Sequence, residues 1–549
     1  MTATTLKRPA FGHAMAVTNH PAASAAAAQM LAEGGNAVDG AVAGLLALSV
    51  CEPMMVGLFG GGVFHLRRPD GRHSIHDGLA TAPAAAHATM FTPARPDEPL
   101  AIEAVGRANM VGPLSVGVPG NLLAWCAALE AEGRFSLADV IQPAIRLARR
   151  GFRVSHYLSD CAAECASDLA HDAAIAALFL PDGKPVPAGA WLRNPALAET
   201  LEAIAAGGPA VLHGGAVGAS AAADIAARGG ILTLADLAAQ RMIERQPITA
   251  TYRGFEVLGP PPPSAAGVHV AQMLNLLEGF DMAALGFANP ARLHLLVEAL
   301  KLAFADRAAA TADPAFVEVP VARLISKEYA ALRRAELDPA HASTWRPGVS
   351  PGEAHTTHLT VADSDGFIVA ATHTINSLFG ARFMLAETGL IPNNYMALFN
   401  PRPGLANSVA PGKRVTTSMA PLILLKEGRP WAALGLPGGL RIFGSAMQAV
   451  LNLVDHAMSL SQAVEAPRLW TQGGPLEMEA GFGEATRAAM TAMGHEVRNV
   501  PVVAGGMCAI RWHEDGMLEG AACWRADGTP IGVSGGAARA GVRFFPDAP

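Results

Sequence analysis

Charged and aromatic residues are both scarce in this 549-residue chain, at 16% and 6% of the composition. The formal net charge is −7 and no cluster of Lys and Arg offsets it, which excludes the basic surface that nucleic-acid binding requires. The longest apolar run near the N-terminus, residues 41–51, is too short to cross a bilayer. We therefore expect a small-molecule or peptide substrate, with no nucleic-acid and no membrane partner.

Cysteine is sparse too, since six residues spread over the whole chain do not reach the density of a disulfide scaffold. Cys161 and Cys165 stand at helical i, i+4 spacing, but no histidine pair at ligand spacing accompanies them. The glycine run at residues 57–62 lacks the Gly-Lys-Ser/Thr ending of a phosphate-binding loop. We expect no metal site and no cofactor.

A secretory leader is a further absence. Residues 1–12 include Lys7 and Arg8, but no apolar segment with a cleavage site follows these two charges. On this ground we expect a cytoplasmic protein.

Apolar residues, in contrast, make up 51% of the chain, and 57 glycines allow layers to pack closely around a large core. Helical patterns cover residues 21–33, 37–50, 267–280 and 290–313, and most of 121–240. Strand patterns cover residues 14–18, 63–66 and 252–258, and residues 421–436 form a hairpin pattern that turns at Glu427-Gly428. Helices flanking two sheets predict a layered α/β architecture.

The stretch Thr356-Thr357-His358 opens an alternating run that turns over at Asp365-Gly366, which predicts a β-hairpin. Two threonines suit an ordinary strand. A threonine can also be a complete catalytic unit once the bond before it is cut, because its freed α-amine serves as base for its own hydroxyl. The polar residues 336–353 are where an exposed tail would follow such a cut.

Several other motifs accompany this stretch in a fixed order. They are Gly34-Gly35-Asn36-Ala37-Val38-Asp39, Gly60-Gly61-Gly62, Pro261-Pro262-Pro263-Ser264, Thr374-Ile375-Asn376, Gly389-Leu390-Ile391-Pro392-Asn393-Asn394, Lys413-Arg414-Val415-Thr416-Thr417-Ser418-Met419 and Leu436-Pro437-Gly438-Gly439-Leu440-Arg441. Together with Thr-Thr-His, the set resembles the γ-glutamyltransferase family of N-terminal-nucleophile hydrolases over about residues 13–545.

The resemblance implies a four-layer αββα sandwich and a precursor that cuts itself before Thr356. Residues 1–355 would form the large subunit, and residues 356–549 the small subunit that carries the nucleophile. The two would be intertwined in one catalytic domain, a heterodimer of its own cleavage products that could itself pair into a dimer.

The catalytic residues follow from the same resemblance. Thr356 would be the nucleophile, and Thr357, one residue further on, is the competing candidate. Thr374 would supply a hydroxyl that tunes the nucleophile. Gly438 and Gly439 would donate their backbone N–H groups to the oxyanion, where a Cβ would obstruct the approach.

The substrate-binding residues match the family only in part. Thr417 and Ser418 would contact the carboxylate of the acyl donor, and Asn376 its amino group. Leu79 stands where the family has an arginine for the glutamyl α-carboxylate, and Leu398 where it has an aspartate for the α-ammonium. Burying the glutamyl zwitterion without these counter-charges would cost several kcal/mol for each charge, so we expect the substrate to differ.

Two further departures concern the same pocket. Tyr395 replaces a family glutamine, and Arg382 stands where the family has glycine, so that it is either a relocated carboxylate clamp or a solvated surface arginine. The loop at residues 400–412 is shorter than the family's lid loop, which predicts a more open cleft.

Three acyl donors remain open: γ-glutamyl amides such as glutathione, a small amide such as oxamate, and a side-chain acyl group as in cephalosporin-acylase-like members. A catalytically inactive binding homologue is the alternative class, and the intact Thr356, Thr374, Gly438 and Gly439 speak against it. Ser534 lies in a Gly-x-Ser-x-Gly pattern typical of a nucleophile elbow, but no histidine follows it to complete a triad.

Overall fold

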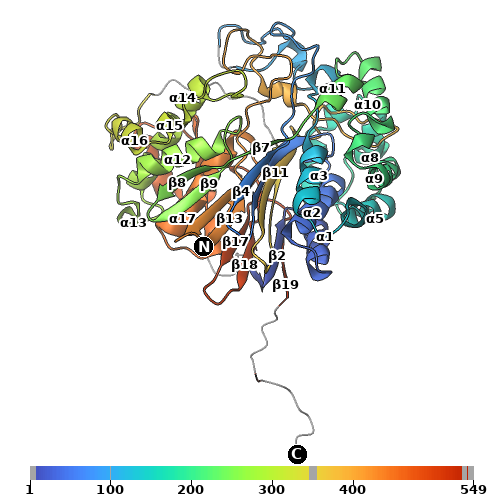
Figure 1. The fold of residues 1–549 in the computed structure, drawn as a ribbon. Helices are drawn as coiled ribbons and strands as arrows, with labels where there is room; N and C mark the ends of the chain where they lie inside the picture. Colours follow the sequence, from blue (N-terminus) through green and yellow to red (C-terminus); the bar gives the residue numbers. More distant parts are fainter. Residues whose placement is uncertain (1–7, 99–100, 345–354, 535–540, 542–549) are drawn as a thin grey trace, which may run out of the picture.

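Two seven-stranded antiparallel sheets lie face to face at the centre of the molecule in the computed structural model, which describes residues 8–98, 101–344, 355–534 and 541 (Figure 1). The first sheet has the order β19 (Thr529–Val533), β2 (Ala14–Thr18), β10 (His355–Ala362), β11 (Ile368–Asn376), β3 (Gly61–Arg67), β4 (His73–Asp77) and β7 (Ile243–Arg245). The second has the order β1 (Ala10–Gly12), β18 (Leu518–Ala522), β17 (Cys508–Trp512), β13 (Arg429–Gly435), β12 (Leu422–Lys426), β9 (Phe255–Gly259) and β8 (Ile248–Tyr252).

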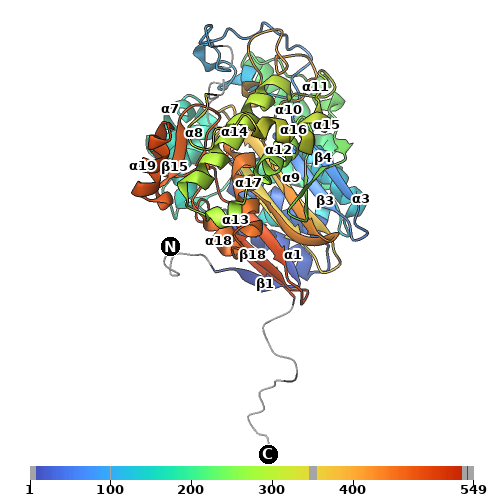
Figure 2. The same ribbon diagram turned by 90° about the vertical axis from the view of Figure 1, so that its left-hand side faces the viewer.

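Helices cover the outer face of each sheet, which completes the four layers of an αββα sandwich and confirms the predicted fold class (Figures 1 and 2). The first sheet is covered by α1 (Pro21–Ala32), α2 (Ala37–Cys51) and α3 (Asn121–Glu132), and the second by α12 (Ala266–Leu277), α14 (Pro290–Ala310) and α17 (Ile442–Val454). A separate apolar cluster, with Met15 and Ala370 from one sheet and Ile423 and Ile510 from the other, fills the space between the sheets.

The motif at Asn36 starts the central helix α2. The Asn36 side chain accepts from the N–H groups of Val38 and Asp39, and the Asp39 carboxylate accepts from the Asn36 N–H, which is a capping box. All residues of α2 are buried, so its polar start needs these internal partners. The motif therefore has a structural role.

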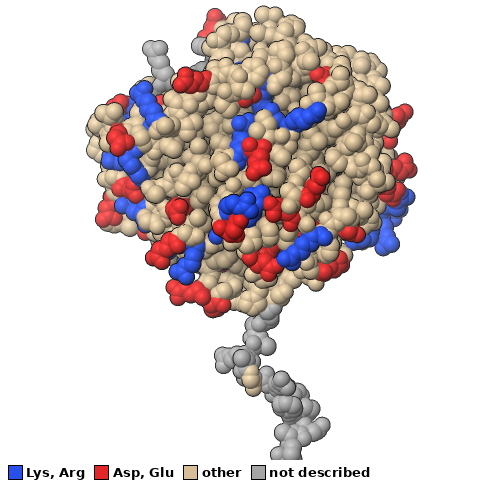
Figure 3. Space-filling view, in the orientation of Figure 1, with Lys and Arg blue, Asp and Glu red and all other residues tan. Residues whose placement is uncertain are grey.

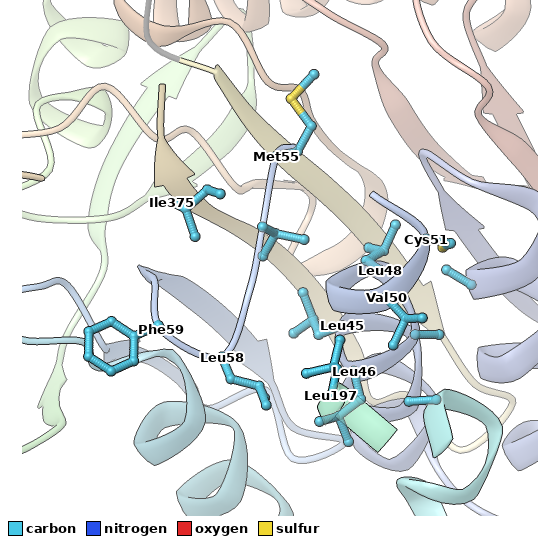
Figure 4. Close-up of a cluster of buried hydrophobic side chains, with 14 of the residues drawn as sticks. Leu45, Leu46, Leu48, Val50, Cys51, Met55, Leu58, Phe59, Leu197 and Ile375 are labelled. Atoms are coloured by element: carbon cyan, nitrogen blue, oxygen red, sulfur yellow. The ribbon is translucent and has the colours of Figure 1, made fainter. Parts of the chain in front are cut away.

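The segment that follows α2 packs against the β10–β11 hairpin, where Met55, Leu58 and Phe59 belong to the same buried cluster as Ile375 on β11 (Figure 4). The Ile375 N–H donates to the Met55 carbonyl oxygen at 3.0 Å. This contact fixes the end of β11, where two of the predicted site residues lie.

Strands from the two sides of the His355–Thr356 bond are hydrogen-bonded neighbours in both sheets. In the first sheet, β10 lies between β2 and β11, and β11 lies between β10 and β3; in the second, β12 pairs with β9. The segments 8–344 and 356–534 are therefore joined by strand hydrogen bonds and shared cores, which a cut between them would leave in place.

Most predicted elements are confirmed, including the hairpins that turn at Asp365-Gly366 and at Glu427-Gly428. The prediction of one strand over residues 252–258 is wrong: β8 ends at Tyr252 and β9 begins at Phe255, joined by a tight turn with positive φ at Arg253 (50°) and Gly254 (83°). Only Arg253 and Gly254 separate Tyr252 from Phe255, and so short an interruption resembles the alternation within one strand.

The remaining elements lie around this sandwich. Between α3 and β7 they are α4 (Leu137–Val140), α5 (Gln142–Arg150), β5 (Phe152–Arg153), α6 (His156–Glu164), α7 (Ala166–Leu169), α8 (Ala173–Phe179), β6 (Trp191–Leu192), α9 (Pro195–Gly207), α10 (Ala216–Ala227) and α11 (Leu234–Ala239). Further along the chain they are α13 (Met282–Leu285), α15 (Val321–Leu324), α16 (Lys327–Arg334), α18 (Leu460–Glu465), β14 (Leu469–Trp470), β15 (Leu476–Glu479), α19 (Glu484–Ala492) and β16 (Val497–Val500).

Within the described ranges, one helical stretch has the length and apolar composition of a membrane span, Pro209–Ala227. It is broken into a 3-10 turn at Pro209–Val211 and the 12-residue helix α10, which is shorter than the roughly 20 residues a span requires. Acidic and basic side chains are intermixed on the face of the molecule drawn in Figure 3.

Candidate active site

Thr356 and Thr357 lie at the start of β10 and face different surroundings. His355 is opposite Asn376 on β11 and Thr357 is opposite His373, so Thr356 falls in an irregularity of the register. Thr356 lines a cavity. Thr357 is fully buried, and its hydroxyl donates to the Glu52 carboxyl at 2.6 Å. Of the two candidates, only Thr356 borders a space that a substrate could enter.

Thr374, near the end of β11, contacts the peptide bond that precedes Thr356. Its hydroxyl hydrogen-bonds to the carbonyl oxygen of His355, and the same hydroxyl oxygen accepts from the Asn376 N–H at 2.7 Å. The Thr374 hydroxyl proton thus points at the carbonyl group of the peptide bond that would be broken by a cut before Thr356.

Asn376 ends β11 in the left-handed region, with φ of 81°. Its side-chain NH₂ donates to the backbone and side-chain oxygens of Asn394, at 3.1 and 3.0 Å. Asn394 also accepts from the Ser377 N–H at 2.9 Å. The Asn393-Asn394 motif therefore holds the turn after β11 and places Asn376 at the cavity.

Gly438 and Gly439 follow β13 with φ of 139° and 57°, both in the region that favours glycine. Gly439 lines the cavity. A Cβ on Gly438 would lie 2.5 Å from the Cβ of Ala504, so the chain has no room for one. The two glycines thus permit a backbone path that places Gly439 at the cavity beside Thr356.

The cavity encloses about 420 Å³ of space, its open mouth included. Apolar side chains and short polar ones share its wall, and among its described lining residues there is no carboxylate. The hydroxyl oxygens of Thr417 and Ser418 are buried without a hydrogen-bond partner in the described part of the chain. The lining consists of Arg307, Thr356, Thr374, Asn376, Tyr395, Leu398, Thr416, Thr417, Ser418, Met419, Gly439, Leu440 and Ile442.

Two of the predicted substrate-binding residues lie elsewhere. Leu79 is fully buried in an apolar cluster with Val63 and Met396 and is not part of the cavity wall. Arg382 is neither a free clamp nor a solvated surface residue, because it is ion-paired with Asp168, which also binds Arg107. Both predictions for Arg382 are wrong, since the half-buried carboxylate of Asp168 already pairs with its guanidinium.

Leu398 and Tyr395 do line the cavity, as predicted from their places in the motif. The Tyr395 hydroxyl donates to the Gly61 carbonyl oxygen at 2.7 Å, so its polar atom is already bonded and its ring faces the site as an apolar wall. Leu398 and the Tyr395 ring together make this side of the cavity apolar, which is unfavourable for a charged head group.

Two residues at the site carry no signal in the sequence. Arg307, in the last turn of α14, lines the cavity, but a basic residue at a helix end is common and suggests nothing further. Glu52 directly follows α2, and burial raises the pKa of its carboxyl to about 8. Its contact with Thr357 joins residues that are remote in the sequence, which a pattern of neighbours cannot reveal.

A second, larger cavity adjoins the first and shares Arg307, Leu398, Thr416 and Leu440 with it. It encloses about 1150 Å³, open space included, and residues 404–407 of the predicted short loop form part of its wall. The site therefore has an inner part at Thr356 and an outer part toward this loop.

His294, Glu298 and His495 are side chains of the described region that could hold a metal ion by their proximity. They are already bonded within the protein: His294 and His495 share a hydrogen bond of 2.8 Å, and Lys301 donates to Glu298 at 2.7 Å. Because the ammonium group supplies the positive charge, this cluster is a polar network of the core.

The comparisons with known proteins agree with this arrangement. A sequence model of the family described as gamma-glutamyltranspeptidase matches residues 23–533. The acylase ACY 1 proenzyme of Pseudomonas sp. (strain SE83) is 56% identical over 540 residues, which cover 98% of this chain and 97% of that protein. The glutathione hydrolase proenzyme of Escherichia coli (strain K12) is 37% identical over 515 residues, covering 90% and 87%.

Among solved structures, the cephalosporin acylase from Bacillus halodurans has the same fold, with a TM-score of 0.88 and 27% sequence identity. The match covers 98% of this chain and 99% of that one.

Proposed function

Since the chain belongs to the gamma-glutamyltranspeptidase family of amidohydrolases and acyltransferases, we propose that it is an acylase whose acyl donor carries no α-ammonium group. Its relatives of this family are made as proenzymes, and they include both acylases and glutathione hydrolases. These two kinds of enzyme are distinguished by whether the acyl donor carries the α-ammonium group of a γ-glutamyl residue.

The lining of the inner cavity carries the proposal. Leu398 borders the same space as Thr356, and no described lining residue is an acid that could neutralise an ammonium group. Leaving that charge unpaired in a buried site costs several kcal/mol. The 56% identity to a protein named as an acylase supports the same choice.

We assign the catalytic roles by position. The hydroxyl of Thr356 attacks the amide carbonyl carbon of the donor while the Thr356 α-amine takes the hydroxyl proton. The tetrahedral oxyanion is stabilised by N–H groups at Gly438 and Gly439. The carbon–nitrogen bond then breaks, the amine leaves with the proton, and water hydrolyses the acyl ester to release the acid and the free threonine hydroxyl.

The same hydroxyl makes the mature enzyme. In the precursor it attacks the carbonyl carbon of His355, whose oxygen is hydrogen-bonded to Thr374. The peptide bond is exchanged for an ester, and water then gives a carboxylate on His355 and the free amine on Thr356. The product is a heterodimer of residues 1–355 and 356–549.

A substrate panel tests the proposal with the self-cleaved protein. We expect glutaryl and other ω-carboxyacyl or simple acyl anilides to be hydrolysed with a higher kcat/KM than γ-glutamyl anilide, glutathione or oxamate. The deficit on γ-glutamyl donors should lie mainly in KM, because ground-state binding of the head group is what the cavity lacks. A micromolar KM for glutathione would overturn the proposal.

A further inference from the structure

Arg307 borders both parts of the cavity and makes no ion pair or side-chain hydrogen bond within the described part of the chain. Its Nε atom is buried and without a hydrogen-bond partner. Burial lowers the pKa of Arg307 to about 10, so the guanidinium remains charged at neutral pH. A cation in this position is a ready partner for an anion that enters the cavity.

Two other arginines show how the protein itself can pair a guanidinium with a carboxylate. Arg382 is paired with Asp168, and Arg525, whose side chain is fully buried, is paired with Glu479. In both cases the protein supplies a carboxylate for the guanidinium. Arg307 borders the cavity and has no such carboxylate among the described residues.

The neighbours of Arg307 define what the anion must be attached to. Thr417 and Ser418 offer two hydroxyl groups without partners, which can donate to carboxylate oxygens. Leu398, Met419 and Leu440 line the same space and suit methylene groups. A short aliphatic chain that ends in a carboxylate matches both features, and the planar guanidinium can bind that carboxylate in a bidentate way.

Resting on the proposed acylase function, we propose that Arg307 binds the terminal carboxylate of an ω-carboxyacyl donor and thereby selects such donors. The acyl carbonyl then lies at Thr356 and Gly439, and its methylene groups lie along Leu398. The site reads a single negative charge at the far end of the acyl group, where a γ-glutamyl donor would bring a carboxylate and an ammonium group together.

Arg307 also lines the outer cavity, so it could bind a carboxylate on the leaving amine instead of one on the acyl group. The substrates must therefore carry a carboxylate at one of these two places independently of the other. Four anilides do this: glutaryl and valeryl acyl groups, each joined to p-nitroaniline and to p-aminobenzoate. The variants are Arg307→Met and Arg307→Lys. Arg292→Met is the matched control, because Arg292 lies buried on the same helix and lines neither cavity.

For the wild-type enzyme we expect glutaryl to exceed valeryl in kcat/KM on both leaving groups. Arg307→Met should lower kcat/KM for both glutaryl anilides by about 10- to 100-fold, mainly through KM, and should leave the valeryl anilides unchanged. Arg307→Lys should recover part of the loss, since the charge is kept and the bidentate geometry is not. Arg292→Met should leave the ratio of glutaryl to valeryl turnover unchanged.

Three outcomes would overturn the assignment. A loss confined to p-aminobenzoate donors would place Arg307 on the leaving-group side, and an equal loss on all four donors would make it structural. Equal wild-type rates for glutaryl and valeryl would remove the anion preference while leaving an acylase. Failure of the acylase function itself would appear separately, as wild-type turnover of γ-glutamyl anilide well above that of every glutaryl and valeryl donor.

Discussion

The two ends of the inner cavity differ in how far their polar groups are bonded within the protein. At the nucleophile end, the Thr374 hydroxyl contacts the His355 carbonyl and the Asn376 N–H, and Asn376 is held by Asn394. At the acyl end, the hydroxyls of Thr417 and Ser418 have no partner among the described residues. The polar groups at the nucleophile end are therefore positioned before substrate binds, whereas those at the acyl end gain hydrogen-bond partners only when a substrate binds.

This difference implies that changes at the two ends should have different kinetic signatures. Changes at the nucleophile end should lower kcat on every donor, because each donor uses the same attacking and stabilising groups. Changes at the acyl end should move KM and the order of preference among donors.

Replacing Thr356 by alanine should have the largest effect. The Thr356→Ala protein should remain one chain on a denaturing gel and have no activity, because the group that cuts the precursor is the one that attacks the donor. Thr357→Val is the control and should still be cut, since its hydroxyl faces Glu52. If the Thr356→Ala protein were cut, or if the small chain began at Thr357, the assignment of Thr356 as the nucleophile would be wrong.

Replacing Gly439 by valine should lower kcat by about 10²-fold on glutaryl and γ-glutamyl donors alike, as expected for the loss of one oxyanion donor. The φ of 57° at this position is unfavourable for valine, so the N–H group must move. Gly428→Val, in a hairpin turn with φ of 71° and open space around its Cβ, imposes similar strain away from the site. A folded Gly439→Val enzyme with unchanged turnover contradicts the oxyanion role.

Replacing Leu398 by aspartate tests the acyl end. The new carboxylate could pair with an α-ammonium group, so kcat/KM for γ-glutamyl anilide should rise about tenfold. It would also stand beside Arg307 and repel a donor carboxylate, so kcat/KM for glutaryl anilide should fall. Leu398→Asn, of the same size without the charge, is the control. Parallel changes on both donors would show that charge at this position does not select the acyl group.

Replacing Glu52 by glutamine should have the smallest effect, on stability. Burial raises the pKa of Glu52 from 4.5 to about 8, so the folded state binds more protons than the unfolded state between these values. The free energy of unfolding should therefore fall as pH rises from about 4.5 to 8, and Glu52→Gln should reduce that slope.

Denaturant unfolding of the uncut Thr356→Ala chain at several pH values measures the slope without a mixture of processed forms. Glu33→Gln, at an exposed carboxyl, serves as the control. An unchanged slope in Glu52→Gln would mean that Glu52 ionises in the folded state as it does in the unfolded chain.

The sequence by itself determined the layered fold and the β10–β11 hairpin that carries the proposed nucleophile. Asn36 and Asp39 form their cap within four residues, and the Glu427-Gly428 turn joins two adjacent strands, so both features rest on local backbone chemistry that a pattern reports directly. The order of the motifs added the family and the positions of Thr356, Thr374 and Asn376, all of which are placed together by one hairpin.

Only the tertiary structure decided which side chains face the cavity from remote parts of the chain. The motifs predicted both Leu79 and Leu398 to line the substrate pocket in place of charged residues. In the structure Leu79 is buried in an apolar cluster and only Leu398 lines the site. Arg382 and Arg307 are both arginines near apolar residues, and they differ because Asp168, 214 positions before Arg382, neutralises only the first. Whether a half-buried charge is paired depends on neighbours that folding brings together, so no local pattern could separate the ion-paired Arg382 from Arg307, which borders the cavity.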